Sequence, residues 1–252
     1  MTRPGFICVL LGVLAFTSQQ AAADRPRLAL VMDDIGWDMR IGQRVLALPG
    51  PITVAVLPGT PMGNRLAQKA YGAGVEVILH QPMTAMFATD AGPGSLIPGM
   101  DASALRRRLA QNLDEIPHHV GVSNHMGSLL TRCETSMAAV MAELAGRGLY
   151  FLDSRTTHYS VALDAARSAR VPATRRDVFL DHILDAGAIE RALEAAVAMA
   201  EARGYAVAIG HPHRLTLEIL EARLPGLQER VELVPVSVLL PVLSPTTLAA
   251  GS

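Results

Sequence analysis

Residues that could bind a metal or transfer protons recur along the chain, directly after short apolar runs. They are Asp33, Asp34, His80, Asn124, His125, Asp153, Asp181, His182, His211 and His213. If the runs are parallel strands, their carboxyl ends meet at one edge, where barrels and open parallel sheets place their active sites. Loops are polar in general, but the recurrence of these residue types directly after successive apolar runs favours a single site that contains them.

The adjacent carboxylates Asp33 and Asp34 have two interpretations. They could form a surface turn, or one could bind a metal while the other meets substrate or water, because neighbouring strand side chains point in opposite directions. With His80 and His125, one carboxylate completes a set of two imidazoles and one oxygen. This set is typical of catalytic zinc with an open coordination position, and it also suits non-haem Fe(II). The chain has no HExxH or Cys-x-x-Cys motif, so the site depends on tertiary assembly.

His211 and His213 flank Pro212 after the last well-formed strand. They could be a structural pair, but an imidazole titrates near neutral pH and can equally serve as a general acid. Arg155, two residues after Asp153, could orient a carboxylate. The chain has no Gly-x-Gly-x-x-Gly, P-loop or Gly-x-Ser-x-Gly motif, which disfavours nucleotide binding and serine-hydrolase chemistry.

The elements that must position these residues alternate regularly along the chain. The apolar runs predict strands at residues 28–32, 52–57, 75–79, 120–123, 149–152, 178–180, 205–209 and 231–238. Amphipathic segments predict helices at 41–48, 63–73, 104–113, 136–147, 188–203 and 215–223. Near-continuous apolar strands indicate a parallel sheet buried on both faces. The pattern predicts a single α/β domain with a closed or partly closed barrel of seven or eight parallel strands; a doubly wound open sheet is the competing architecture.

Composition limits the class of protein. Hydrophobic residues make up 50% of the 252 residues and charged residues 18%, which provides enough apolar mass for a folded core. The net charge is -1, so a nucleic-acid partner is not expected, because that binding depends on basic patches. The only tryptophan is Trp37, and aromatic residues make up 4% of the chain, so platforms for stacking on sugars are scarce.

Residues 1–23 are typical of a secretory signal peptide, with Arg3 before an apolar run and small residues at its end. The apolar run is short for a bilayer span, and an uncleaved anchor is the alternative. We therefore expect an exported, periplasmic protein with no stable membrane span after signal cleavage, a barrel domain at 24–241 and a loose tail at 242–252. Cys8 lies in the signal, which leaves Cys133 without an internal disulfide partner.

Six motifs together resemble the divergent polysaccharide deacetylase family, which comprises exported bacterial proteins distantly related to NodB-type carbohydrate esterases. They are VMDDIG at 31–36, HQPM at 80–83, NHMGS at 124–128, FLDSRTT at 151–157, RDVFLDH at 176–182 and IGHPH at 209–213. The resemblance implies a distorted (β/α) barrel and metal-dependent removal of acetyl groups from an envelope glycan or a peptidoglycan-related substrate.

The resemblance also implies roles for individual residues. Asp33 would be the general base, and the metal, most simply zinc, would be held by Asp34 and His80. The second metal histidine of the NodB pattern is replaced by Thr84, and His125 is the natural substitute ligand.

For the proton donor, His211 matches the late-strand general acid, and Asp153 lies near the carboxylate that tunes it. Arg155, Asn124 and His213 are expected to bind substrate. Two other functions remain open at this stage: a catalytically inactive module that binds a glycan or a protein on the same barrel, and another metallohydrolase that cleaves an amide or a phosphoester.

Overall fold

The computed structural model describes residues 25–87 and 90–240. The strands are β1 (Arg27–Ile35), β2 (Thr53–Val56), β3 (Glu76–Met83), β4 (His119–Met126), β5 (Tyr150–Asp153), β6 (Ala173–Arg175), β7 (Val178–Phe179), β8 (Tyr205–Gly210) and β9 (Glu232–Leu233). The helices are α1 (Met39–Leu46), α2 (Gly63–Gly72), α3 (Ala102–Glu115), the short 3-10 turn η1 (Leu130–Arg132), α4 (Glu134–Arg147), α5 (Ala162–Ala169), α6 (Ala186–Arg203), α7 (Arg214–Leu227) and α8 (Val236–Leu239).

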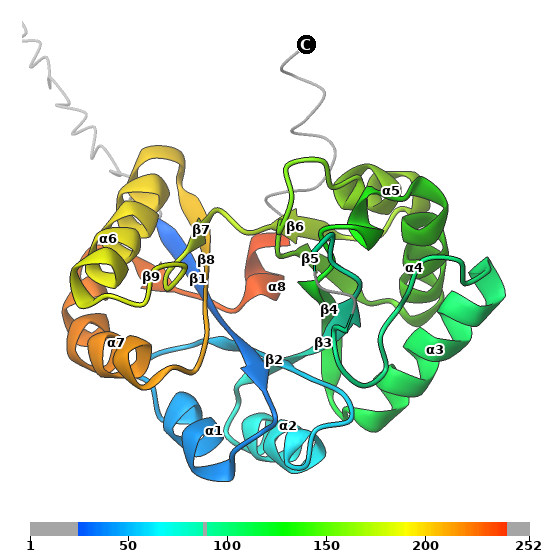
Figure 1. Ribbon diagram of the computed structural model, residues 1–252. Coiled ribbons are helices and arrows are strands. Elements are labelled where there is room, and N and C mark those ends of the chain that lie inside the picture. The colour runs from blue at the N-terminus through cyan, green and yellow to red at the C-terminus, as the bar shows by residue number, and fades with distance from the viewer. Residues whose placement is uncertain (1–24, 88–89, 241–252) are drawn as a thin grey trace, which may run out of the picture.

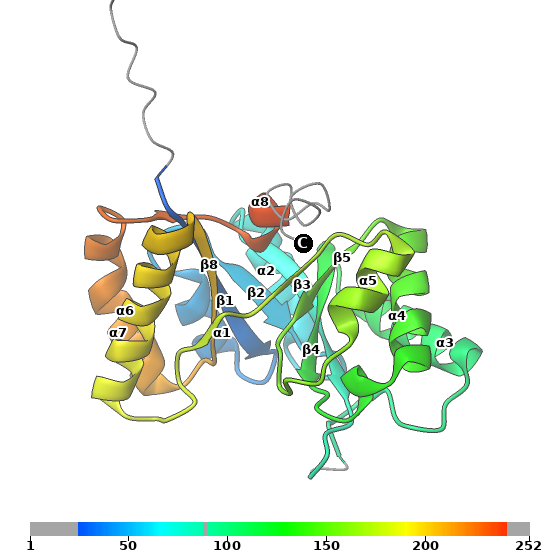
Figure 2. The same cartoon turned by 90° about the horizontal axis from the view of Figure 1, so that it is seen from above.

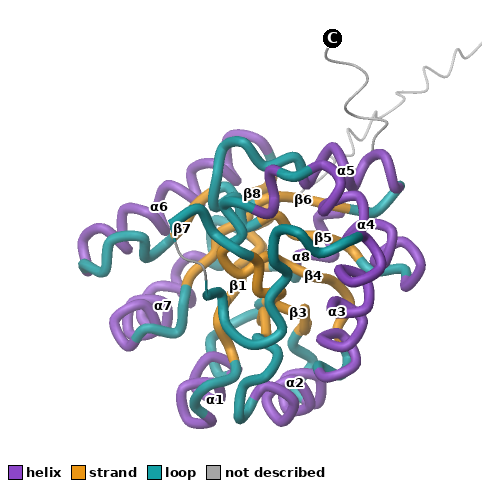
Figure 3. The backbone as a smooth tube through the Cα atoms, turned by 45° about the vertical axis from the view of Figure 1, so that its right-hand side comes forward, coloured by secondary structure: helices purple, strands orange, loops and turns teal. Residues whose placement is uncertain are grey.

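The strands form one curled sheet, ordered β6-β5-β4-β3-β2-β1-β8-β7, and β9 pairs with β1 off this path. Within the described residues, the hydrogen-bonded neighbours in this sheet run parallel to each other. Helices surround the sheet on its outside (Figures 1 and 3). Because β6 and β7 end this order without pairing with each other in the described residues, the curl is a partly closed barrel. The predicted single α/β domain with a distorted barrel is thus confirmed.

Side-chain alternation divides the apolar residues of the strands between two cores. In β1, Leu28, Leu30 and Met32 pack in the outer core between sheet and helices. Ala29 and Val31 pack instead in a smaller core inside the curl. Continuous burial on both faces explains why the strands read as unbroken apolar runs.

Helix α8 closes the amino-terminal end of the curl. The Val236 amide donates to Thr53 Oγ1 over 3.1 Å, and Thr53 is the first residue of β2. Figure 2 shows α8 at one end of the sheet, between the two groups of outer helices. With this end closed, the inner space is accessible from the carboxyl ends of the strands.

The predicted strand at 231–238 is wrong over most of its length. Only Glu232–Leu233 pairs in the sheet, and α8 follows. Pro235 precedes the helix, with a fixed φ and no amide hydrogen to contribute to a strand ladder. Helix α5 and the three-residue strand β6 have no counterpart among the predicted elements. Strand β6 is too short to give a clear periodic pattern.

No helix among residues 25–87 and 90–240 is long and apolar enough to cross a bilayer. The predicted signal peptide at 1–23 and the tail at 242–252 lie outside the described residues.

Candidate active site

Alternation also explains why distant residues meet at the carboxyl edge. The inner-facing residues Val31, Ile78 and Ile209 are each followed two positions later by Asp33, His80 and His211. On β4, His125 shares its face with Ser123, whose hydroxyl lies 2.7 Å from His80 Nδ1. The inner core therefore continues, at its open end, into a layer of carboxylates and imidazoles.

Asp34, His80 and His125 form a compact set of possible metal ligands, whose ligand atoms all lie within 4.8 Å of one another. Asp34 Oδ1 lies 2.9 Å from His125 Nδ1 and 3.3 Å from His80 Nε2. Despite these short distances, this buried oxygen has no hydrogen-bond partner among the described residues. A carboxylate oxygen and two imidazole nitrogens that face one another without hydrogen bonding suit a divalent cation. The residues present therefore fit a metal ion.

The backbone at Asp34 brings both carboxylates to the same place. Asp34 has φ +59, and the pairing of β1 with β2 shifts register between Met32 and Ile35. Consequently Asp33 and Asp34 do not point in opposite directions as strand geometry predicts: Asp33 Oδ2 lies 3.4 Å from the same His80 Nε2. A left-handed backbone is uncommon outside glycine but is tolerated by aspartate, and it is often found at functional sites.

Asp33 is almost fully buried, and its Oδ1 has no hydrogen-bond partner in the described structure. Burial raises the pKa of its carboxyl, although His80 opposes this shift. Burial acts in the same direction on Asp34, but the close contacts of its carboxylate with His125 and His80 outweigh burial and hold the pKa of Asp34 below its ordinary value. The pKa values of the two adjacent carboxyls are thus shifted in opposite directions, as separate roles for a general base and a metal ligand require.

His211 lies on the other side of Asp34, with its Nε2 4.0 Å from Asp34 Oδ2. Its Nδ1 lies 2.9 Å from Asp181 Oδ1, and its backbone amide donates to Asp181 Oδ2. Thr216 donates to the same Oδ2. Burial lowers the pKa of His211, but Asp181 outweighs burial and raises the pKa to about 9. This imidazole is therefore protonated near neutral pH and can donate a proton.

The carboxylate that tunes His211 was expected near Asp153; this expectation is corrected, because Asp181 holds that position. Asp153 lies one residue after the inner-facing Leu152 and shares the parity of Phe151, which packs in the outer core. Its Oδ1 accepts the Arg155 amide over 2.8 Å. Burial raises the pKa of Asp153. Asp153 is therefore a buried carboxyl that shapes the loop after β5.

Two of the predicted substrate ligands also have structural roles. Asn124 is fully buried, and its side chain accepts from the Ser154 amide and donates to the Met126 carbonyl. It holds the ends of β4 and β5 together and is inaccessible to substrate. The carbonyl of Arg155 accepts from Arg176. The guanidinium of Arg155 stays a candidate for substrate binding, whereas Asn124 is a positioning residue.

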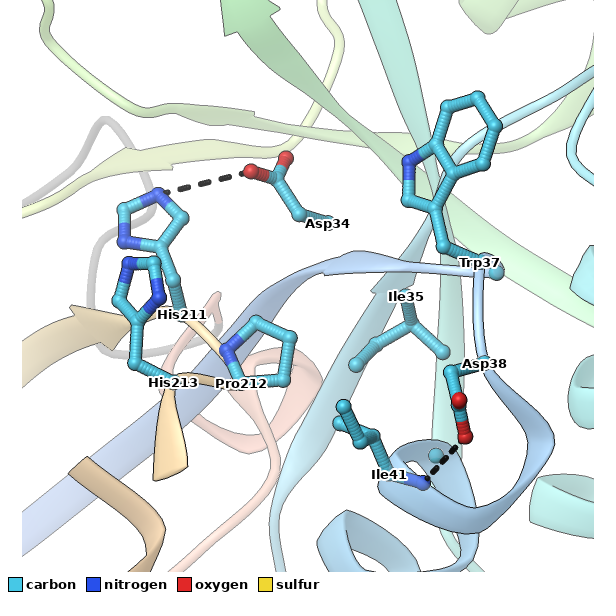
Figure 4. Close-up of a pocket in the computed structure, with 10 residues that line it drawn as sticks. Asp34, Ile35, Trp37, Asp38, Ile41, His211, Pro212 and His213 are labelled. Atoms are coloured by element: carbon cyan, nitrogen blue, oxygen red, sulfur yellow. Dashed lines mark hydrogen bonds and ion pairs between the residues drawn. The ribbon is translucent and has the colours of Figure 1, made fainter. Parts of the chain in front are cut away.

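A cavity of about 170 Å³ lies between the loops that follow β1 and β8, as Figure 4 shows. His211 and His213 line one side of it, and Trp37 and Ile41 line the other. His213 is exposed, so it is accessible to a ligand in this cavity. It also groups with Asp181 and His211, although both Asp181 oxygens already contact His211 or Thr216.

Three residues organise the site without having been assigned a partner from the sequence, although Asp181 was among the candidate polar residues. Asp181 and Ser123 orient His211 and His80 respectively. Arg176 lies over the Phe179 ring at 3.6 Å and donates to the Ser154 carbonyl, which ties the loops after β5 and β7 together. Strand parity would have identified the first two, since both fall on inner-facing positions. The Arg176 contacts join separate strands and have no local pattern.

A family model described as divergent polysaccharide deacetylase matches residues 30–240. The chain belongs to the divergent polysaccharide deacetylase family. The uncharacterised protein YibQ of Escherichia coli K12 is 36% identical over 231 residues, which cover 90% of this chain and 72% of YibQ. The chain therefore matches this relative over most of both sequences.

Solved structures share the fold of this family member. An uncharacterised protein of Agrobacterium tumefaciens C58 superposes with a TM-score of 0.82 at 25% identity, covering 87% of this chain and 91% of that one. The catalytic domain of a peptidoglycan N-acetylglucosamine deacetylase from Eubacterium rectale superposes with a TM-score of 0.55 at 11% identity, and the match covers 86% of this chain and 93% of that domain. A family 4 carbohydrate esterase pseudoenzyme of Bacillus anthracis superposes with a TM-score of 0.54 at 14% identity, and the match covers 86% of this chain and 66% of the pseudoenzyme. At such identities these last two show the fold alone.

Proposed function

We propose that this protein is an exported, zinc-dependent hydrolase that removes acetyl groups from an acetylated envelope glycan. The observation that carries the proposal is the set of Asp34, His80 and His125 ligand atoms, all within 4.8 Å of one another and flanked by a buried carboxyl and a histidine. Membership of the deacetylase family supports a glycan as substrate. Two imidazoles with one carboxylate support zinc as the metal.

Asp34, His80 and His125 would hold the metal. A divalent ion bound there would acidify a water molecule and polarise the acetyl carbonyl. Asp33 is placed to accept a proton, because burial raises the pKa of its carboxyl towards neutral pH and its Oδ1 has no hydrogen-bond partner among the described residues.

His211 would donate the proton that the leaving amine needs, and Asp181 would hold the imidazole in orientation. The side chain of Ser123 fixes His80 in a similar way, through Nδ1, so that Nε2 faces the two carboxylates. In this proposal the Nδ1 atoms of His80 and His211 are held by Ser123 and Asp181. Their Nε2 atoms would bind the metal and donate the proton, respectively.

Metal analysis tests the ligand set directly. We expect the wild type to bind one zinc ion and the Asp34→Ala, His80→Ala and His125→Ala variants to bind it at least tenfold more weakly. His182→Ala, which alters an exposed histidine, serves as the matched control and should bind zinc normally. Stoichiometric metal in all three ligand variants would refute the assignment.

Acetate release from N-acetylglucosamine oligomers tests the reaction. We expect Asp33→Asn to keep its metal and its fold but to lose at least a hundredfold in rate. If the wild type binds metal and glycan yet releases no acetate with any divalent ion, the protein is a binding module on the same barrel. Release of a different acyl group or of phosphate would instead identify another metallohydrolase.

Export is tested by cell fractionation and mass spectrometry. We expect the periplasmic protein to begin at Asp24, after removal of residues 1–23. An intact amino terminus in the membrane fraction would instead identify an uncleaved anchor.

A further inference from the structure

Two cavities meet at the candidate active site, one on each side of Asp34. The first, of about 170 Å³, lies towards His211 and Pro212. The second, of about 300 Å³, lies towards His125 and includes Thr60. Asp34 and Trp37 are the residues that line both. A ligand that reaches the carboxylate therefore has space on both sides of it, and Trp37 borders both spaces.

Trp37 is 59% exposed although it is the largest apolar side chain of the described residues. Figure 4 shows its ring beside Asp34, with the indole nitrogen on the side that faces the carboxylate. Exposing an indole to water is unfavourable, so an exposed tryptophan next to reactive groups indicates a binding surface.

The backbone on both sides of Trp37 is fixed. The Gly36 carbonyl accepts the Met62 amide over 2.8 Å, and a Cβ at Gly36 would lie 2.0 Å from Thr60 Oγ1. On the other side, the Asp38 carboxylate accepts the amides of Arg40 and Ile41 and begins α1. The indole is thus held in place before a ligand arrives, which reduces the entropy lost on binding.

We propose that Trp37 is the platform on which an acetamido-sugar chain lies across the site, with one ring in each cavity and the reacting group above Asp34. The inference rests on the proposed deacetylase function and makes the substrate an oligomer of at least two sugars. A sugar ring has an apolar face, which suits the indole, and hydroxyl edges, which suit the polar groups of the cavities. Trp37 acts here as a specificity residue and takes no part in proton transfer.

The sequence provides a direct probe, because Trp37 is the only tryptophan of the chain. In an Asp33→Asn background, in which turnover is at least a hundredfold slower, we expect N-acetylglucosamine oligomers to change the tryptophan fluorescence in a saturable manner. The tetramer should bind at least tenfold more tightly than the monomer, because it occupies both cavities. This measurement needs no acetate release, so it can fail or succeed independently of the catalytic proposal.

Calorimetry on matched variants in the same background completes the test. We expect Trp37→Ala to weaken tetramer binding about tenfold and Trp37→Phe to weaken it less than threefold. Tyr71→Ala is the control, because Tyr71 is 60% exposed but stacks on His118 at the amino-terminal end of β4. It should bind like the parent. Equal affinity for monomer and tetramer, tetramer binding unaffected by Trp37→Ala, or no tetramer binding at all would overturn the proposal.

Discussion

At the scale of single residues, the site separates groups of the same chemical type by their surroundings. Asp33 and Asp34 are neighbours in sequence, yet burial dominates the first and two imidazoles dominate the second. His80 and His211 are likewise distinguished by their partners, a serine hydroxyl and a carboxylate. The chemistry therefore depends on what each group contacts and not on its residue type alone.

The Asp181 carboxylate is expected to control the protonation of His211. Replacing it by Asp181→Asn removes the negative charge that raises the pKa of His211 to about 9, so burial should then lower that pKa. Histidine NMR titration of the protein should show the midpoint at least one pH unit lower. Thr216→Val keeps the carboxylate and should leave the midpoint nearly unchanged; equal shifts in both variants would contradict the role of Asp181.

Cys133 is exposed, and hydrogen bonds from Ser136 and Thr135 lower the pKa of its thiol to about 7. The thiolate is the reactive form, so alkylation should be slow below pH 7 and reach half its maximal rate at about that pH. Iodoacetamide labelling followed by mass spectrometry measures this profile. Thr135→Ala should move the midpoint to higher pH, whereas a midpoint between 8 and 9 in the wild type would contradict the assigned environment.

At the scale of elements, the turn after β1 is the most constrained part of the site. Gly36 has φ +142, and an added Cβ would overlap the Thr60 side chain. Gly36→Ala should therefore lower the free energy of unfolding by roughly 2 kcal/mol or more. Urea denaturation measures the change.

Gly72 offers a matched control for that substitution. It lies in α2, and a Cβ added there meets nothing within 4 Å. Gly72→Ala should be neutral or slightly stabilising, because alanine favours the helix. Equal losses at both glycines would show that the packing against Thr60 is not the cause.

Helix α8 is the other element that this fold requires, since it closes the inner core. Leu239 is fully buried in that core, and Leu239→Ala should cost about 2–5 kcal/mol in the free energy of unfolding. Val238 lies beside it in α8 but is 41% exposed, so Val238→Ala should change stability by less than about 0.5 kcal/mol. Thermal or urea denaturation of the two variants gives the comparison. Similar losses would show that α8 is not anchored through Leu239.

At the scale of the whole molecule, a metal held by β1, β3 and β4 should couple ligand binding to folding. Zinc at about a hundredfold excess over its dissociation constant should raise the melting temperature by roughly 5–10 °C relative to the chelated protein. Calorimetric scans with and without a chelator measure the shift. At the same zinc concentration, His125→Ala should reduce the shift by about half or more, because it binds the ion at least tenfold more weakly; an undiminished shift in this variant would place the ion elsewhere.

The sequence alone determined the class of fold and the edge at which the chemistry collects. Apolar strands alternating with amphipathic helices indicate a parallel sheet, and candidate polar residues after six of the runs mark its carboxyl edge. The six motifs were also sufficient to identify the family to which the chain belongs. These features are local or periodic, so they are visible in a single chain.

Tertiary structure alone decided which of these groups meet. The left-handed backbone at Asp34 turns two neighbouring carboxylates towards one imidazole, which strand alternation by itself would not allow. Asp181 meets His211 because β7 pairs with β8, whereas Asp153 ends β5, which is not a neighbour of β8 in the sheet. Pairing of this kind depends on register, on curvature of the sheet and on contacts between residues far apart in the chain, and none of these is encoded in local spacing.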